Sequence, residues 1–203
     1  IFGVSFLVLS PEHELINLLC TDEQKETVNK YKLECSKKSE LDRISNINSV
    51  SGEFTGSYAI HPFNNEKIPI WISDYVLSNY GSGAIMAVPA HDSRDFKFAK
   101  NFKIKINQVI SNGTFVDEEP YLEKEGKIIN SSFLNNLSIY QATEKVVKLA
   151  TKENIGFISI NYRLRDAVFS RQRYWGEPFP IYYKNNLPYL LADEELPLKL
   201  PSI

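Results

Sequence analysis

The sequence has few of the residues that form membrane spans, metal sites or the disulfides of proteins in oxidising compartments. Its 203 residues include two cysteines, three histidines and one methionine. No apolar run approaches the roughly 20 residues of a membrane span. Cys20 and Cys35 form no C-x-x-C motif, so we expect both to be reduced thiols in the core of a cytoplasmic protein. Too few histidines accompany them to complete a metal site, and we predict none.

The sequence also lacks a dominant charge. Lys and Arg total 23 against 25 for Asp and Glu, which gives a net charge of −2. A surface that coats nucleic acid without sequence preference is strongly basic, so any nucleic acid must be held by a local patch. A hydrophobic content of 43% is enough for a packed core. The single methionine, Met86, is internal, and we expect the chain to be an excerpt of a longer protein.

Residues 81–95, which read GSGAIMAVPAHDSRD, carry most of the information. The Gly-Ser-Gly opening permits a turn, and the small and apolar residues 84–88 predict a buried strand. Pro89 ends this strand because proline has no N–H to give a sheet ladder. Asp92 is spaced as the N-cap of the next helix, with Asp95 in the first turn. Two interpretations remain open: the carboxylates only cap a helix, or they form the floor of a small-molecule pocket.

Periodicity predicts mixed strands and helices over the first 155 residues or so. The hydrophobic patterns on either side of residues 61–67 predict a hairpin, and Pro69 indicates that its second strand lies at a sheet edge. Ser138 and Gln141 form a capping box. These features favour an α+β or β-barrel-like domain over a doubly wound sheet. Strands are expected at 1–9, 54–60, 68–72, 84–88 and 104–110, helices at 11–19, 21–35, after Asp92 and at 138–153, and a further hairpin at 178–191.

Arginines are concentrated beyond about residue 155. Four of the six lie in the segment YRLRDAVFSRQRYWG, at Arg163, Arg165, Arg171 and Arg173. They alternate with aromatic residues that include Trp175, so the segment can bind a phosphate backbone or stack on bases. A domain junction held by arginine–carboxylate pairs explains the same composition equally well.

Both stretches resemble leucyl-tRNA synthetases of the bacterial type. Residues 81–95 are similar to the Gly-Thr-Gly-Ala-x-Met-Ala-Val-Pro-Ala-His-Asp-x-Arg-Asp motif of their editing domain. Isoleucyl and valyl enzymes usually differ at Met86 and lack the Arg94–Asp95 pair. Tyr-Arg-Leu-Arg-Asp and Ser-Arg-Gln-Arg-Tyr-Trp-Gly resemble the point where the editing insertion returns to the class I catalytic domain. The resemblance implies a β-barrel-like editing (CP1) domain with surrounding helices at 1–157, and at 158–203 a linker and a piece of the Rossmann-like catalytic domain.

The resemblance also implies an activity. Editing domains of this family hydrolyse mischarged tRNA(Leu) without a cofactor, and the parent enzyme attaches leucine to tRNA with ATP and Mg²⁺. Aminoacyl-tRNA synthetases need a second site because one methylene changes binding by only about 1–3 kcal/mol. The resemblance therefore predicts that the protein is a monomer, that it binds tRNA(Leu), and that it makes no contact with a membrane. The alternatives are a non-catalytic RNA-binding or structural module on the same scaffold, and an editing domain of an isoleucyl or valyl enzyme.

Individual residues receive roles on this basis. Asp95 would hold the substrate ammonium through a charged hydrogen bond and Tyr80 would position the ribose or ester, so these are the catalytic candidates. No Ser-His-Asp or Cys-His set is present, and the expected nucleophile is an oriented water. In the family a threonine-rich segment before the position of Ile1 completes the pocket. The substrate-binding candidates are Met86, Val88 (which fits plain core equally well), His91, Asp92 and Arg94.

Overall fold

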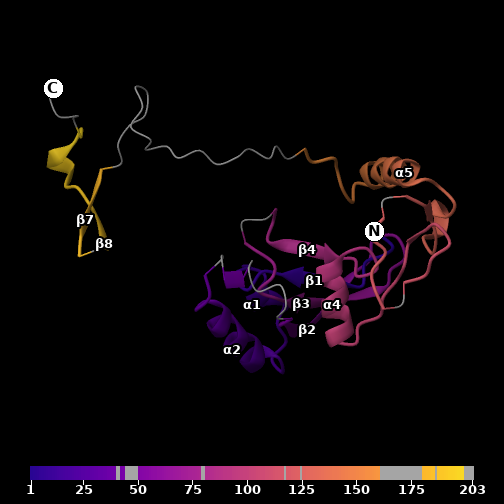
Figure 1. Cartoon of the computed structure of the whole chain (residues 1–203), viewed down its shortest axis with the longest axis horizontal. Coiled ribbons are helices and arrows are strands. Elements are labelled where there is room, and N and C mark those ends of the chain that lie inside the picture. Colours follow the sequence, from indigo (N-terminus) through magenta and orange to yellow (C-terminus); the bar gives the residue numbers. More distant parts are fainter. Residues whose placement is uncertain are drawn as a thin grey trace. The chain divides into compact units, whose positions relative to one another are not determined.

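The computed structural model describes residues 1–39, 42–43, 50–78, 81–116, 118–123, 125–160, 180–185 and 187–198. The chain divides into two compact units, residues 1–158 and 159–203. The first unit contains the elements from β1 to α5, and the second contains the hairpin β7–β8 (Figure 1). None of the helices in the described part of the chain has the length and apolarity that a membrane-spanning helix requires.

The first unit is built on a four-stranded mixed sheet. Its strands, in the order β2-β3-β1-β4, are β1 (Phe6–Leu9), β2 (Glu53–Ile60), β3 (Lys67–Ile72) and β4 (Ala84–Ala87). β1 runs parallel to β3 and antiparallel to β4. β2 and β3 form the predicted hairpin. Gly56, which has a φ of +86°, lies where the register of this pair shifts.

Two expectations about this sheet are wrong. β3 is an inner strand, because Pro69 lies just outside the ladder with β1, which begins at Ile70, and its missing N–H does not interrupt that ladder. The described strands also close no barrel, since the outer strands β2 and β4 are not paired with each other. β4 has only four residues and Pro89 lies two residues beyond its end, so it offers little ladder to a second partner.

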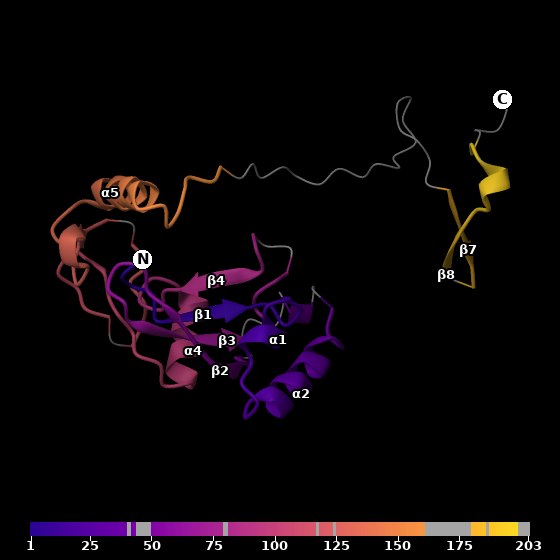
Figure 2. The same ribbon diagram turned by 180° about the vertical axis from the view of Figure 1, so that it is seen from behind.

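The sheet separates two layers of helices. Alternate side chains of β1 point to opposite faces. Leu9 packs with Ile16 of α1 (Ile16–Leu19) and with α2 (Lys25–Cys35), whereas Phe6 packs on α4 (Ser93–Asn101). The rings of Phe6 and Phe98 stack with centroids 4.9 Å apart. α4 crosses in front of the sheet in Figure 1 and behind it in Figure 2, so it covers the face opposite α1 and α2.

Several elements are shorter than the sequence predicts. The first strand is limited to Phe6–Leu9. The first helix begins only at Ile16. Ser10 does not start it, because the Ser10 N–H extends the hydrogen bonding of β1 toward the β4 side by donating to the Gly83 carbonyl at 2.8 Å. Leu15 and Leu18 are 47% and 80% exposed. The strand expected at 104–110 is reduced to β5 (Ile110–Ser111), paired with β6 (Lys127–Ile128).

A smaller core lies under the last helix of the first unit. α5 (Ile139–Lys152) begins at the predicted capping box, in which Ser138 and Gln141 each accept from the other's backbone N–H. Ala142 packs there with Ile128 and with Leu134 of the 3-10 turn η1 (Ser132–Leu134). This cluster joins α5 to β5 and β6.

The second unit contains the predicted hairpin within its described residues. β7 (Ile181–Lys184) pairs antiparallel with β8 (Leu187–Leu190), and the 3-10 turn η2 (Asp193–Glu195) follows. The rings of Tyr182 and Tyr189 stack across the two strands with centroids 5.6 Å apart.

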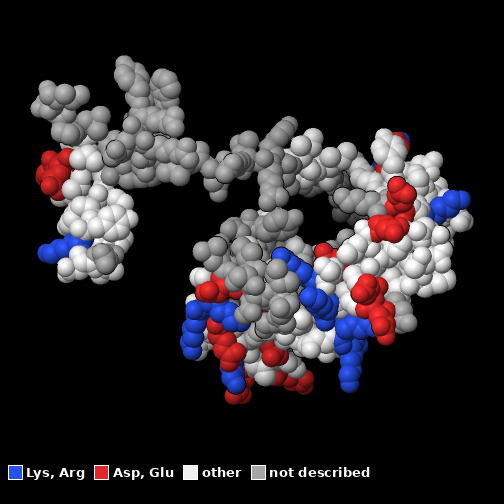
Figure 3. Space-filling model, in the orientation of Figure 1, with Lys and Arg blue, Asp and Glu red and all other residues white. Residues whose placement is uncertain are grey.

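Charged side chains of both signs share the surface of the first unit. On the face visible in Figure 3, Lys and Arg residues are interspersed with Asp and Glu residues. The described ion pairs include Lys38–Asp74 at 2.6 Å, which joins the end of α2 to the connection that follows β3.

Candidate functional site

The start of α4 places three charged residues of the 81–95 motif close together. Asp92 is the N-cap, as predicted: its Oδ1 accepts from the backbone N–H groups of Arg94 at 2.8 Å and Asp95 at 3.0 Å. This satisfies two amides that have no partner within the helix. The cap orients the first turn so that Asp95 lies on the sheet side of α4, where it is only 5% exposed.

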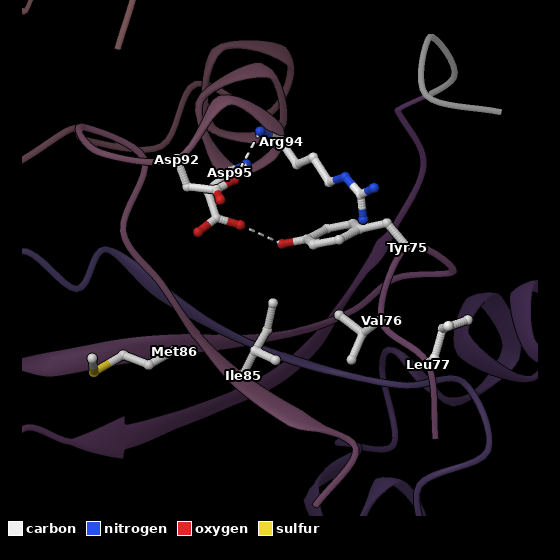
Figure 4. Close-up of a pocket in the computed structure, with 8 residues that line it drawn as sticks. All are labelled: Tyr75, Val76, Leu77, Ile85, Met86, Asp92, Arg94 and Asp95. Carbon is white, nitrogen blue, oxygen red and sulfur yellow. Dashed lines mark hydrogen bonds between the residues drawn. The ribbon is translucent and has the colours of Figure 1, made fainter. Parts of the chain in front are cut away.

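A pocket of about 410 Å³ opens beside this turn. Three successive segments between residues 75 and 95 contribute to its wall (Figure 4). Apolar side chains dominate, and the charged groups are gathered at one side. The lining residues are Tyr75, Val76 and Leu77 from the β3–β4 connection, Ile85 and Met86 from β4, and Asp92, Arg94 and Asp95 from the start of α4.

Asp95 is the buried charge of this pocket. Its Oδ2 accepts from the Val88 N–H at 2.8 Å, and its Oδ1 accepts from the Tyr75 hydroxyl at 2.9 Å. Burial raises the pKa of the Asp95 carboxyl to about 6, and the charge of Asp92 adds to the rise; the two hydrogen bonds and Arg94 oppose it. The carboxyl is therefore largely ionised at neutral pH. Each carboxylate oxygen has more than one lone pair, so capacity remains for a ligand in the pocket.

Tyr75 was not singled out by the sequence. Its hydroxyl points at Asp95 (Figure 4). Burial raises the pKa of the Tyr75 phenol, and the neighbouring Asp95 charge raises it further, so the group stays a hydrogen-bond donor. No periodicity marks this residue, because its partner lies 20 positions away in another element. Val76, Leu77 and Ile85 were likewise missed as pocket residues.

His91 lies on the other side of the same turn. Its Nε2 accepts from the backbone N–H groups of Val109 and Ile110, both at 3.1 Å, so this nitrogen carries no proton. Its Nδ1–H donates to the Tyr121 carbonyl at 3.0 Å. Partial burial lowers the pKa of the imidazole, which favours this neutral form. Both ring nitrogens are occupied by the backbone, and His91 is not among the residues that line the pocket.

The other predicted site residues differ in their placement. Arg94 and Met86 line the pocket, and Met86 is 42% exposed. Figure 4 shows its side chain extending away from Asp95. Val88 contributes its N–H rather than its side chain, which packs at Gly3, where an added Cβ would lie 2.9 Å from Val88 Cγ1.

Several predicted site residues lie outside the described residues. Tyr80 is one of them. The remainder form the arginine-rich segment: Arg163, Arg165, Arg171, Arg173 and Trp175.

The arrangement can bind a small cation that carries an apolar group. The ionised Asp95 supplies the charge, and the side chains around it supply apolar contact. Within the described ranges, no three His, Cys, Asp or Glu side chains are grouped so that they could hold a metal ion. A carboxylate beside the apolar walls of a pocket is the arrangement expected of a small-molecule binding site that can pair with a cationic group.

Comparison with known proteins identifies the family. The sequence model described as leucyl-tRNA synthetase, editing domain, matches residues 1–151. The chain therefore belongs to the leucyl-tRNA synthetase editing-domain family.

Relatives of known identity agree with this assignment. Over its whole length the chain is 52% identical to the leucine–tRNA ligase of Amoebophilus asiaticus and 54% identical to that of Azobacteroides pseudotrichonymphae. A crystal structure of a leucyl-tRNA synthetase from Agrobacterium radiobacter K84, in a ternary complex with tRNA and LeuAMS, matches 98% of the chain with 30% identity and a TM-score of 0.59. The chain spans 22% of the length of each of these proteins.

Proposed function

We propose that the pocket beside α4 is the hydrolytic editing site of a leucine–tRNA ligase, and that its substrate is tRNA(Leu) carrying a near-cognate amino acid. The observation that supports this most is Asp95, an ionised carboxylate that is 5% exposed and lines a pocket with apolar walls. A buried charge is unfavourable without a partner. Val88 and Tyr75 give the carboxylate two neutral hydrogen bonds, and a substrate ammonium would supply the opposite charge.

The substrate fits the pocket in two parts. The ammonium of the esterified amino acid would donate a charge-assisted hydrogen bond to a free lone pair of the Asp95 carboxylate. Its apolar side chain would contact Ile85, Met86 and Val76. Asp92 has a separate role as the helix cap, and Arg94 at the rim can contact a phosphate or the ester end. His91 is left out of the proposed site because both of its nitrogens are already bonded.

The proposed reaction is hydrolysis by a positioned water. The water oxygen attacks the ester carbonyl carbon and the bond from that carbon to the ribose oxygen breaks. The ribose oxygen takes up a proton released by the water, which leaves a free ribose hydroxyl and the free amino acid. Fixing the ammonium end places the ester at a constant distance from the attacking water, and such positioning contributes much of an enzyme's acceleration. Tyr80 remains our proposal for the ribose or ester contact.

Further proposals concern the parent enzyme. The whole ligase would attach leucine to tRNA with ATP and Mg²⁺, and the editing pocket would need no cofactor. Residues 1–157 would be the editing domain, and residues 158–203 a linker and a piece of the Rossmann-like catalytic domain. The arginine-rich segment, from Arg163 to Trp175, would contact tRNA or hold the junction. A monomer in the cytoplasm, where tRNA is charged, fits these roles.

The decisive experiment compares the complete ligase with its Asp95→Ala variant. Loss of a charged hydrogen bond in a pocket corresponds to about 1.5–3 kcal/mol, so deacylation of mischarged tRNA(Leu) should slow by about tenfold to a hundredfold. Aminoacylation with leucine should remain nearly unchanged, which serves as the control for folding. Wild-type protein that binds the mischarged tRNA without hydrolysing it would support the non-catalytic alternative. Unaltered deacylation by Asp95→Ala would return Asp95 to a structural role.

A further inference from the structure

Asp95 can bind an ammonium in one defined place only if its carboxylate keeps a single orientation. The two oxygens are held by different donors, with the Val88 N–H on Oδ2 and the Tyr75 hydroxyl on Oδ1. The Val88 donor belongs to the backbone immediately after β4, so it is available whatever side chain occupies that position. The Tyr75 donor is a side chain from the connection between β3 and β4, and it is therefore the adjustable part of this arrangement.

The ring of Tyr75 is held against the α4 side of the core. It packs on the cluster that contains Phe98, and the two ring centroids are 5.9 Å apart. Because burial and the Asp95 charge raise the pKa of the Tyr75 phenol, the hydroxyl keeps its proton and donates it to the carboxylate. An aromatic ring fixed by packing has little freedom to move its hydroxyl away from Asp95.

The backbone next to Tyr75 is anchored from the opposite layer of the sheet. The Asp74 N–H donates to the Tyr31 hydroxyl oxygen of α2 at 3.1 Å. The Asp74 carboxylate accepts from the Ser51 hydroxyl at 2.9 Å and from the Lys38 ammonium at 2.6 Å. Three separate groups thus fix the residue before Tyr75, and this fixes where the phenol enters the pocket.

We propose that Tyr75 is the positioning residue for Asp95: its hydroxyl holds the carboxylate in the rotamer that faces the substrate ammonium. This inference rests on the proposed function of the pocket. Tyr75 acts through Asp95 and not on the ester itself. The charged and titratable groups that face Asp95 are Asp92 and Arg94 from the start of α4 and Tyr75 from the β3–β4 connection; Val88 adds only its N–H.

The test is a pH profile of deacylation by the complete ligase with Tyr75→Phe. The variant keeps the ring and removes one donor to the carboxylate, so the pKa of Asp95 should rise by about one unit. The acidic limb of the profile should move upward by the same amount from its wild-type position near pH 6. Deacylation should fall about twofold at pH 7 and about tenfold at pH 5, with further loss where the carboxylate is misoriented.

Two further variants make the result specific. Tyr121→Phe is the matched control, because Tyr121 also donates its hydroxyl, to the Glu125 carbonyl at 2.6 Å, but does not line the pocket. It should leave the profile unchanged. In an Asp95→Asn background, Tyr75→Phe should have little additional effect, because the group through which it acts is no longer ionisable. Thermal unfolding of each variant checks that the fold is kept.

The outcomes separate the positioning role of Tyr75 from the editing function of the pocket. If wild-type ligase deacylates and Asp95→Asn does not, while Tyr75→Phe retains the wild-type rate and profile, the positioning role of Tyr75 is wrong and the editing site stands. A Tyr75→Phe effect that persists in full without an ionisable Asp95 also overturns it. If wild-type ligase does not deacylate at all, or Asp95→Asn is fully active, both the proposed function and this inference are overturned.

Discussion

His91 and Asp95 lie on either side of the N-cap of α4, and they differ in whether their polar atoms have hydrogen-bonding capacity left for a ligand. Both ring nitrogens of His91 are bonded to the backbone of residues 109–110 and 121, and no capacity remains. Asp95 receives one donor on each oxygen and still faces a pocket. The family motif contains both residues, yet only one has chemistry to offer a ligand. Unused hydrogen-bonding capacity at a cavity, rather than membership of a motif, distinguishes the candidate site from its support.

The strongest way to break this comparison is His91→Ala. The substitution removes the partners of two amides and one carbonyl, each worth about 1–3 kcal/mol when left unsatisfied. Because water can reach part of this site, we expect the free energy of unfolding to fall by about 2–4 kcal/mol in chemical denaturation. Deacylation by the folded fraction should change much less than in Asp95→Ala.

His13→Ala is the matched control for that substitution. The ring of His13 accepts a single backbone N–H, from Leu15 at 3.1 Å, so its removal should lower the free energy of unfolding by no more than about 1 kcal/mol. If His91→Ala were as mild as His13→Ala in stability but abolished deacylation, His91 would contact the substrate and the comparison would fail.

The pH dependence of stability should have opposite signs for the two residues. The folded pKa of Asp95 is raised to about 6 from 3.8, so its stabilising contribution is present at low pH and is lost as pH rises through that interval. Asp95→Asn should therefore be up to about 3 kcal/mol more stable than wild type at pH 7.5, with little difference at pH 3.5.

The corresponding series for His91 should slope the other way. Its folded pKa is lowered from 6.5, so its contribution is present above pH 6.5 and is lost as pH falls below that value. Urea denaturation of wild type, Asp95→Asn and His91→Gln between pH 4 and 8 measures both slopes. For each variant, the difference in free energy of unfolding from wild type is plotted against pH. If the two differences changed with pH in the same direction, Asp95 and His91 would share one environment and the comparison would fail.

A smaller effect should separate capping from charge at Asp92. Asp92→Ala loses the acceptor of two backbone amides and should lower the free energy of unfolding by about 1 kcal/mol. Asp92→Asn keeps a capping oxygen and should lower it by a few tenths. Both variants remove the Asp92 charge, which helps to raise the pKa of Asp95, so both should shift the acidic limb of deacylation slightly downward. A loss of deacylation in Asp92→Asn would instead make its charge part of the site.

Local pattern was sufficient where the contacts are local. Asp92 caps α4 through amides two and three residues ahead, and Ser138 and Gln141 close a capping box within one turn. The hairpin β2–β3 followed from two alternating runs around a turn. Four of the pocket residues, Met86, Asp92, Arg94 and Asp95, were named in advance because the continuous motif at residues 81–95 resembles the family motif; their spacing alone left capping and pocket roles open.

The sequence by itself therefore determined the hairpin β2–β3, the caps at Asp92 and Ser138 and the motif that contains Asp95. Only the tertiary structure decided that Tyr75 reaches Asp95 across 20 residues, that His91 bonds a carbonyl 30 residues away, and that β3 lies inside the sheet despite Pro69. The physical reason is that backbone propensity and periodicity act within a few residues, whereas partners across elements are chosen by how the layers pack. A polar side chain becomes a site or a support according to the neighbours that this packing leaves beside it.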